Sequence, residues 1–312
     1  MKVSVCMITY NHEKYIKQAI EGVLMQECNF DVELIIADDC SLDNTYKIIV
    51  DMQQKHANGS WIQYTKHTVN KGMMPNFIWA LDQCQSKYIA ICEGDDYWTD
   101  PLKLQKQVDF LEANQDFVIC GHNAKIIDAD GIVIQEKKIP ELNINTEYSS
   151  IDLKKGAFFL TLTLVFRNVI QNFPKEFYKV KNGDTFLISL LGNYGKGMYI
   201  EDIDLAMYRV HGGGVWSKLN QKEKWLNSFN SYNIIKDYYE KKGDLAIVKE
   251  LGLKLKMINN NLFKNLDSET EFKSYFVIVV NYIHYNKVLK SYSKSKVVLK
   301  ISLKYFYRKL FK

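Results

Sequence analysis

The amino-acid sequence predicts an α/β fold: a mostly parallel central sheet with helices on both faces, followed by a helical C-terminal region. Two observations lead to this prediction. In the first hundred residues, short apolar runs alternate with amphipathic stretches of helical spacing, and short turns separate them. From Gln221 onward the helical pattern continues almost to the end of the chain. Strand–helix alternation with short turns is typical of α/β units built on parallel strands.

Four strands and four helices are expected in the N-terminal part. The strands are nearly continuous in apolar character, as strands covered on both faces are. They are expected at Val3–Thr9, Val32–Ala37, Trp61–Thr65 and Ser86–Cys92. The helices are expected at Glu13–Gln26, from Asp43, around Pro75–Gln83 and at Leu102–Glu112.

The elements beyond residue 113 are mixed. Two strands, Phe117–Asp128 and Ile132–Glu136, should pair antiparallel around the turn between them, and Pro140–Ile151 is expected to be a loop. A β-rich stretch, a helix that begins after Asn182-Gly183-Asp184 and two further strands are then expected, at Phe158–Arg167, Thr185–Leu191, Gly195–Ile200 and Asp204–His211.

Composition limits the class of protein. The chain has 312 residues, of which 47% are hydrophobic and 25% charged, with a net charge of +5, values ordinary for a globular protein. No run reaches the ~18 apolar residues of a membrane span. The apolar run after Lys2 is too short for a signal peptide and is interpreted as a strand. Six cysteines without a C-x-x-C pair indicate free thiols in a reducing cytoplasm.

An acidic turn follows the fourth strand. Glu93, Asp95 and Asp96 lie within four residues, and carboxylates this close repel one another unless a cation lies among them. Oxygen ligands of this kind suit Mg²⁺ or Mn²⁺. The alternative is a solvated turn in which Asp100 caps a helix that begins at Pro101.

Polar clusters follow three of the predicted strands. They are Thr9-Tyr10-Asn11, Asp38-Asp39 and Glu93-Gly94-Asp95-Asp96. Ligands of parallel α/β sheets bind beyond the carboxyl ends of the strands, so these clusters should meet at one edge. The sequence has neither G-x-G-x-x-G after the first strand nor a Walker lysine. Phosphates would therefore be neutralised by a carboxylate-held metal, which indicates a nucleotide diphosphate ligand.

Several motifs in this order resemble the glycosyltransferase family 2 enzymes of the GT-A fold. V-S-V-C-M-I-T-Y-N and E-L-I-I-A-D-D-C-S-L-D-N-T resemble the nucleotide-binding opening of that family, and E-G-D-D-Y-W-T-D-P occupies the place of its D-x-D metal motif. N-G-D-T-F-L and Y-R-V-H-G-G-G-V-W-S resemble downstream elements of the bacterial branch that builds surface polysaccharides. The resemblance covers residues 1–217. One position departs from it, because Glu93 replaces the first aspartate of D-x-D.

The resemblance implies roles for individual residues. Asp38 would only cap or orient its turn, whereas Asp39 would accept a hydrogen bond from a uracil ring. Asp95 would hold the ribose or the metal. The residues implied in donor binding are Thr9, Tyr10, Asn11, Asp39, Asn70, Glu93 and Asp95. The residues implied as metal ligands for Mn²⁺ or Mg²⁺ are Asp95, Asp96 and His211.

The resemblance also implies that Asp184 is the general base of an inverting transfer, taking the proton of the acceptor hydroxyl. Its place at a helix N-terminus should favour the ionised form. A helix cap is the alternative role. Arg209 is expected to pair with a phosphate or with Glu201 or Asp202. The aromatic pair Tyr97-Trp98 is expected to flank the sugar or to pack in the core.

The predicted function is that of a metal-dependent inverting hexosyl- or N-acetylhexosaminyltransferase. It would move a sugar from a nucleotide-diphosphate donor, a UDP-sugar, to a glycan or lipid-linked acceptor in the synthesis of capsule or lipopolysaccharide. Residues 1–219 would form the catalytic domain, with a nucleotide-binding half over 1–100 and an acceptor half over 101–219. The alternatives are a nucleotidyltransferase, although Met7–Asn11 lacks its glycine-rich basic loop, and a non-catalytic sugar-nucleotide-binding or assembly protein.

The C-terminal region, residues 220–312, is expected to be helical and basic. From Phe272 to Lys312 it contains no Asp or Glu, and lysines alternate with apolar residues. A basic amphipathic helix of this kind can lie on an anionic membrane surface, here the inner face of the cell membrane. A solvated helix on the catalytic domain and a homodimer contact are the alternatives. Nucleic acid is disfavoured, because no aromatic-basic binding motif accompanies the charge.

Overall fold

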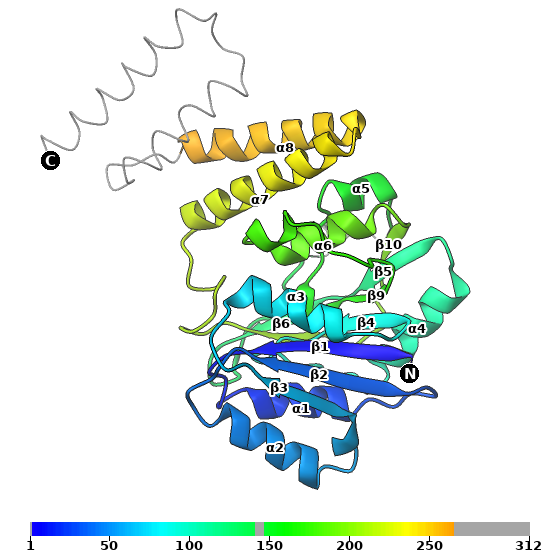
Figure 1. Ribbon diagram of the computed structural model, residues 1–312, viewed down its shortest axis with the longest axis vertical. Coiled ribbons are helices and arrows are strands. Elements are labelled where there is room, and N and C mark those ends of the chain that lie inside the picture. Colours follow the sequence, from blue (N-terminus) through cyan, green and yellow to red (C-terminus); the bar gives the residue numbers. More distant parts are fainter. Residues whose placement is uncertain (1, 141–146, 265–312) are drawn as a thin grey trace, which may run out of the picture. The chain divides into compact units, whose positions relative to one another are not determined.

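The computed structural model describes residues 2–140 and 147–264 (Figure 1). The chain divides into two compact units, Met1–Lys218 and Leu219–Lys312. The predicted α/β class, with a mostly parallel sheet and a helical C-terminal extension, is confirmed.

The first unit is built on a sheet of eight strands in the order β3-β2-β1-β4-β9-β5-β10-β8. The strands are β1 Val3–Thr9, β2 Val32–Asp38, β3 Ile62–Lys66, β4 Tyr88–Ile91, β5 Phe117–Gly121, β8 Glu147–Tyr148, β9 Val165–Arg167 and β10 Lys196–Tyr199. Strands β1 to β4 are mutually parallel, as are β5 and β10. Strand β9 runs antiparallel between β4 and β5. The carboxyl ends of β1, β2 and β4 therefore share one edge.

Helices cover both faces of this sheet. The core on one face combines side chains of β1, β2 and β4 with those of α1 (Ile16–Leu24), α2 (Thr45–Lys55) and α4 (Lys103–Ala113). Figure 1 shows α3 (Met73–Gln83) and α6 (Gly183–Leu191) over the other face. Because strands with both faces covered bury every side chain, β4 is buried throughout.

A small second sheet lies in the same unit. Its order is β11-β6-β7, with β6 at Ala124–Ile127, β7 at Val133–Gln135 and β11 at Ala206–Arg209. The predicted antiparallel pairing around the turn after Ile127 is present, but the single predicted strand Phe117–Asp128 is wrong. It divides into β5 and β6 because Asn123 interrupts it: its side chain bonds the backbone of Ala124 and of Ile139 instead of continuing the ladder.

The prediction of a loop over Pro140–Ile151 is wrong at its end, where the described chain forms β8 and begins α5 (Ser150–Lys154). A capping box starts this helix, since Ser149 and Asp152 bond each other's backbone amides. The β-rich stretch Phe158–Arg167 contains a 3₁₀ turn, Thr161–Thr163, before the short strand β9.

The second unit contains α7 (Gln221–Lys241) and α8 (Leu245–Lys264), which pack against each other. Asn220 and Glu223 form the capping box that starts α7. Gly243, whose φ of 76° lies in the left-handed region that favours glycine, makes the turn between the two helices. The basic stretch 272–312 lies outside the described residues. Among the described helices, none has a stretch both long and apolar enough to cross a bilayer.

Helix α1 packs closely against the backbone of Trp98, which follows the acidic turn, and this contact depends on Gly22. A Cβ at this position would lie 2.8 Å from Trp98 N and 2.9 Å from Trp98 O, both backbone atoms. Trp98 itself is buried and donates its indole N–H to Leu162 O, so it packs in the core.

We predict that Gly22→Ala lowers the free energy of unfolding by about 1–3 kcal/mol, because backbone rather than a flexible side chain must move. Urea denaturation followed by tryptophan fluorescence measures this change. Gly252→Ala in α8, where a Cβ meets nothing within 4 Å, is the control and should be neutral or stabilising. Equal midpoints for wild type and Gly22→Ala would contradict the packing argument.

Candidate active site

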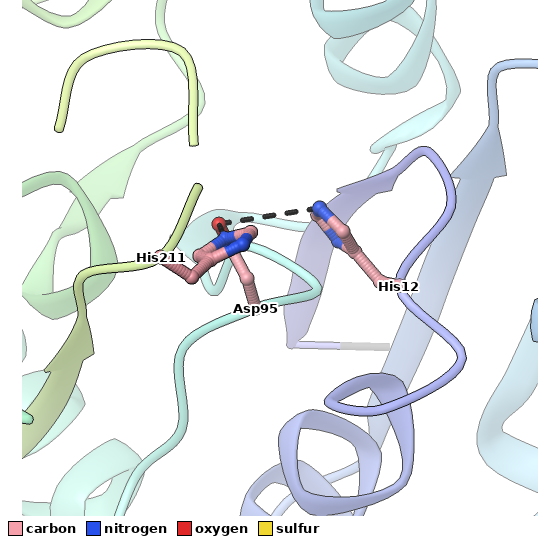
Figure 2. A group of neighbouring side chains, drawn as sticks. All are labelled: His12, Asp95 and His211. Carbon is pink, nitrogen blue, oxygen red and sulfur yellow. Dashed lines mark hydrogen bonds and ion pairs between the residues drawn. The ribbon is translucent and has the colours of Figure 1, made fainter. Parts of the chain in front are cut away.

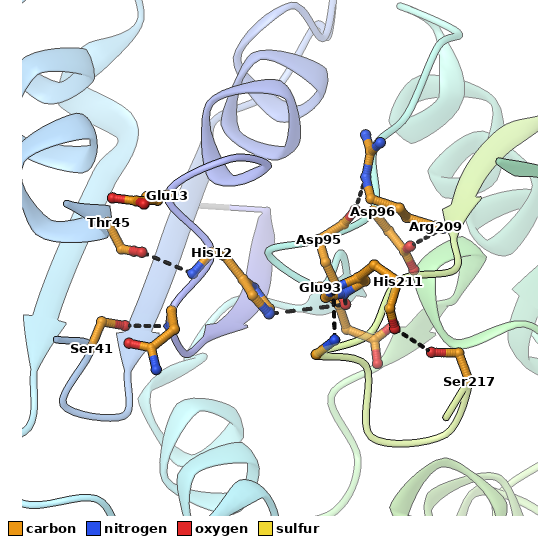
Figure 3. Close-up of polar contacts among 12 residues, drawn as sticks. His12, Glu13, Ser41, Thr45, Glu93, Asp95, Asp96, Arg209, His211 and Ser217 are labelled. Carbon is orange, nitrogen blue, oxygen red and sulfur yellow. Dashed lines mark hydrogen bonds and ion pairs between the residues drawn. The ribbon is translucent and has the colours of Figure 1, made fainter. Parts of the chain in front are cut away.

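The loops after β1 and β2 are tied together by main-chain to side-chain bonds. Asn11 adopts a left-handed conformation with φ of 56°, a region that asparagine tolerates better than most residues. The backbone amide of Asn11 donates to Ser41 Oγ (2.8 Å), and its side-chain oxygen accepts from Leu42 N (2.8 Å). The His12 amide donates to Thr45 Oγ1 at 2.9 Å, which Figure 3 shows. These bonds fix the direction in which His12 leaves the loop.

Asp39 orders the loop that carries Asn70. Its two carboxylate oxygens accept from the amides of Lys71 (2.7 Å) and Gly72 (2.9 Å), and Asn70 Oδ1 also accepts from Gly72 N at 3.0 Å. The buried Asp38 accepts from Ser41 N and from the Tyr64 hydroxyl. Asp38 therefore orients its turn, as expected. The donor-binding roles of Asp39 and Asn70 remain predictions.

The acidic turn lies directly against the end of β1. Gly94 N donates to Ile8 O (3.0 Å), and a Cβ on Gly94 would come within 2.9 Å of Thr9 Oγ1 and 3.0 Å of His12 Nδ1. Glycine is therefore required for this approach. Asp39 N also donates to Thr9 O at 2.9 Å. The three polar clusters predicted at strand ends thus meet at one edge, where Tyr10 is exposed and Thr9 is buried.

Two histidines flank the carboxylate of Asp95. The Nε2 atoms of His211 and His12 lie 3.0 Å and 4.0 Å from Asp95 Oδ2, and the three candidate ligand atoms lie within 4.8 Å of one another. Figure 2 shows both rings directed at the carboxylate. This is a possible His/Asp metal site. Asp95 and His211 were predicted as ligands from the sequence, but His12 was not, although it directly follows Thr9-Tyr10-Asn11.

Electrostatics distinguish Asp95 from its acidic neighbours. Burial raises its pKa, but the hydrogen bond from His211 and the charges of both histidines outweigh burial, so the pKa of Asp95 lies below its usual range. Burial lowers the pKa of His12, although the charge of Asp95 partly opposes this. The surroundings of Asp95 therefore favour its ionised form, whereas burial disfavours the charged form of His12.

The other carboxyl groups of the turn have raised pKa values. Burial, then the charge of Asp95 and then that of Asp184 raise the pKa of Glu93 to about 8. Burial and the charges of Asp95 and Glu93 raise the pKa of Asp96 well above its usual range. Asp96 is buried and accepts from Arg209 N at 2.7 Å. It lies outside the His12, Asp95 and His211 group, and its role as a metal ligand remains a prediction.

Asp184 lies at the start of α6 and within electrostatic range of this cluster. Its charge acts on Glu93 and on the Tyr208 hydroxyl. Its side chain accepts from Thr185 N at 2.7 Å and from Thr161 Oγ1 at 3.3 Å. The bonds at the helix start lower the pKa of Asp184, as expected, but burial outweighs them, so its pKa lies above the ordinary value. A carboxylate of raised basicity is suited to accept a proton.

The Arg209 side chain bonds main-chain carbonyls and a glutamine, not the acidic side chains expected for it. It is buried, and its guanidinium donates to Asp95 O (3.0 Å) and Gln18 Oε1 (2.7 Å) and to two carbonyls of the turn after β6. The expected pairing with Glu201 or Asp202 is wrong for this reason. Arg209 connects α1, the acidic turn and β11.

The protein is an α/β protein whose candidate ligand site lies at the carboxyl ends of its parallel strands. Comparison with known proteins identifies the family. Residues 4–172 match the family model described as glycosyl transferase family 2. The chain belongs to glycosyltransferase family 2, as the resemblance predicted.

Two relatives illustrate its place in the family. An uncharacterized protein of Mycobacterium tuberculosis is 32% identical over 69% of this chain, and the alignment spans 60% of that relative's length. The Escherichia coli UDP-Glc:alpha-D-GlcNAc-diphosphoundecaprenol beta-1,3-glucosyltransferase WfaP is 28% identical over 68% of this chain and 79% of its own.

Solved structures share the fold. Staphylococcus aureus TarS 1–349 in complex with UDP-GlcNAc superposes with a TM-score of 0.63 at 16% identity, covering 91% of this chain and 80% of TarS. The mannosyltransferase PcManGT of Pyrobaculum calidifontis, in complex with GDP-Man and Mn²⁺, superposes with a TM-score of 0.55 at 13% identity, covering 99% of this chain and 87% of its own.

The raised pKa of Glu93 predicts how stability depends on pH. Between its ordinary value of 4.5 and about 8, the native carboxyl keeps a proton that the unfolded chain has lost, so the free energy of unfolding falls as pH rises through this window. Glu93→Gln removes the titrating group, and with it this pH-dependent fall in the free energy of unfolding. In EDTA we expect the variant to gain about 1 kcal/mol or more over wild type at pH 8 relative to pH 4.5, measured by urea denaturation. The exposed Glu27→Gln is the control, and a gain independent of pH would contradict the prediction.

Proposed function

We propose that this protein is a metal-dependent inverting glycosyltransferase that uses a UDP-sugar and acts on a glycan or lipid-linked acceptor in surface polysaccharide synthesis. The observation that carries the proposal is the contact of His211 with Asp95 at the sheet edge, beside Glu93, on which the charge of Asp184 acts. The E. coli relative, named for UDP-Glc and a diphosphoundecaprenol acceptor, and the UDP-GlcNAc complex of TarS support the donor and acceptor classes.

The donor nucleotide is assigned to the edge formed by the ends of β1 and β2. Tyr10 is 42% exposed and can cover a base. Thr9 Oγ1 is buried without a hydrogen-bond partner among the described residues, which leaves it a bond to offer to a ligand. The carboxylate of Asp39 holds the neighbouring loop and retains lone pairs for a ring N–H. Asn11 and Asn70 shape the rim of this site, and Glu93 lies at its sugar end.

Asp95 and His211 are the proposed metal ligands. The ionised carboxylate and the imidazole nitrogen lie 3.0 Å apart, about the separation of neighbouring ligands on one octahedral ion. This donor pair fits a divalent cation, which when bound supplies positive charge that stabilises the departing diphosphate. Ser217 Oγ and Gly214 N both donate to His211 O, and these bonds fix the ligand loop.

Asp184 is the proposed general base. In an inverting transfer the acceptor oxygen attacks the anomeric carbon from the side opposite the leaving nucleotide, and its proton passes to a carboxylate on that side. The hydrogen bonds from Thr185 N and Thr161 Oγ1 hold the Asp184 side chain in place, and its raised basicity suits it to receive the proton. The raised pKa values of Glu93 and Asp96 keep further negative charge away from the diphosphate.

The two alternative functions differ in their products. A nucleotidyltransferase would release diphosphate from a nucleoside triphosphate, whereas a sugar-nucleotide-binding protein would release nothing. Incubation of the full-length protein with a panel of UDP-sugars, Mn²⁺ and candidate acceptors, with detection of free UDP, separates them. UDP release that depends on acceptor supports the proposal. Diphosphate release, or donor binding without any UDP, would replace it.

Asp184→Asn should reduce turnover by about 10²–10⁴-fold, because the amide cannot accept the acceptor's proton. The donor Kd should change less than about threefold, since the group acts on the acceptor and not on the nucleotide. Acceptor-dependent UDP release measures the first quantity, and calorimetry with UDP measures the second.

The surface variant Asp51→Asn, which loses only an exposed ion pair with Lys55, is the matched control for the loss of one carboxylate. It should turn over like wild type. Normal turnover in Asp184→Asn would remove Asp184 from the base role. An equal loss of turnover and UDP affinity would make it a structural residue.

A further inference from the structure

His12, in the loop that follows β1, places a second imidazole beside Asp95. The first, that of His211, lies just after β11. His12 Nε2 is 4.0 Å from Asp95 Oδ2, and the ring centroids of the two histidines are 5.9 Å apart, edge to face. Neighbouring ligands on one octahedral ion at about 2.1 Å lie about 3 Å apart. His211 and Asp95 already have this spacing, and a shift of about 1 Å in the His12 ring would complete a three-ligand set.

The backbone around His12 is anchored independently of its ring. The His12 amide donates to Thr45 Oγ1 (2.9 Å) and the Glu13 amide to Asp43 Oδ2 (2.9 Å). The ring is therefore held near the carboxylate by bonds that do not involve its nitrogens. Its side chain is 16% exposed and that of His211 is 7% exposed, whereas Asp95 keeps 21%. The two imidazoles cover the carboxylate and leave a partial opening for a ligand.

The chemistry of these three donors differs from that of an all-oxygen site. Mg²⁺ prefers oxygen ligands and retains its waters, whereas first-row transition ions accept imidazole nitrogen readily. We propose that His12 is a third metal ligand and that the site therefore binds first-row transition ions in preference to Mg²⁺, with Mn²⁺ the weakest binder of that row. This inference rests on the proposed function, which assigns a divalent cation to Asp95 and His211. The remaining coordination positions are left to diphosphate oxygens and water.

The test uses the full-length protein after removal of metal, with Mn²⁺ alone as the probe. Manganese binds nitrogen ligands less strongly than later ions of its row, so it is the stringent choice. Titration followed by the EPR signal of free Mn²⁺, repeated with Mg²⁺ as competitor, gives both affinities. We expect wild type to bind Mn²⁺ at least about tenfold more tightly than Mg²⁺. His12→Gln should lose about tenfold in Mn²⁺ affinity with little change for Mg²⁺.

His56→Gln is the matched control, because His56 follows α2 and its ring Nδ1 accepts from the backbone amide of Asn58. It should bind both ions like wild type. Pulsed EPR of bound Mn²⁺ provides a readout that does not require any variant to fold: coupling to two imidazole nitrogens is expected in wild type. One nitrogen in wild type, or unchanged Mn²⁺ affinity in a folded His12→Gln, would overturn the proposal.

The outcome is separable from that of the proposed function. If UDP release is normal but the Mn²⁺ affinity is the same in wild type and His12→Gln, only the assignment of His12 as a ligand is wrong. If Mn²⁺ binds through both histidines but no UDP-sugar is turned over, the transfer function is wrong and the metal site stands.

Discussion

The candidate site depends on the pairing of the acidic turn with β11. Tyr97 and Met207 exchange backbone hydrogen bonds, and Arg209 donates its amide to Asp96 and its guanidinium to Asp95 O. These contacts join segments more than a hundred residues apart. They place His211, two positions beyond Arg209, next to the carboxylate of Asp95. A buried arginine whose donors are satisfied by fixed carbonyls makes this junction rigid.

The same junction explains why four carboxyl groups can share a small region. The His211 hydrogen bond and the charges of both histidines stabilise Asp95 as an anion, whereas the Arg209 amide bonds the carboxyl group of Asp96. The burial of Glu93, Asp96 and Asp184 favours their neutral forms, and their mutual repulsion acts in the same direction for Glu93 and Asp96. The cluster therefore combines one anion suited to hold a cation with neighbours that bind protons readily.

The sequence predicted the parts of this arrangement that local patterns encode. Apolar runs located β1, β2 and β4, and the topology rule then brought their polar ends together without any tertiary information. The break at Asn123 was missed because it depends on bonds to Ile139, sixteen residues away. The role of Arg209 was missed for the same reason, since its partners lie on three other elements. For His12 the only local signal was its position directly after the polar cluster that ends β1, and its distance to Asp95 had to come from the structure.

The position of His12 also changes the physical basis of the metal hypothesis. Three crowded carboxylates in the sequence suggested oxygen ligands, and the family resemblance added His211 to Asp95 and Asp96. The structure instead gives Asp95 two imidazole neighbours and directs Asp96 toward Arg209 N. A site with one carboxylate and two imidazoles places less negative charge beside a diphosphate than a site with three carboxylates would. Since the donor diphosphate is itself anionic, this arrangement reduces the repulsion that an acidic site would impose on its own ligand.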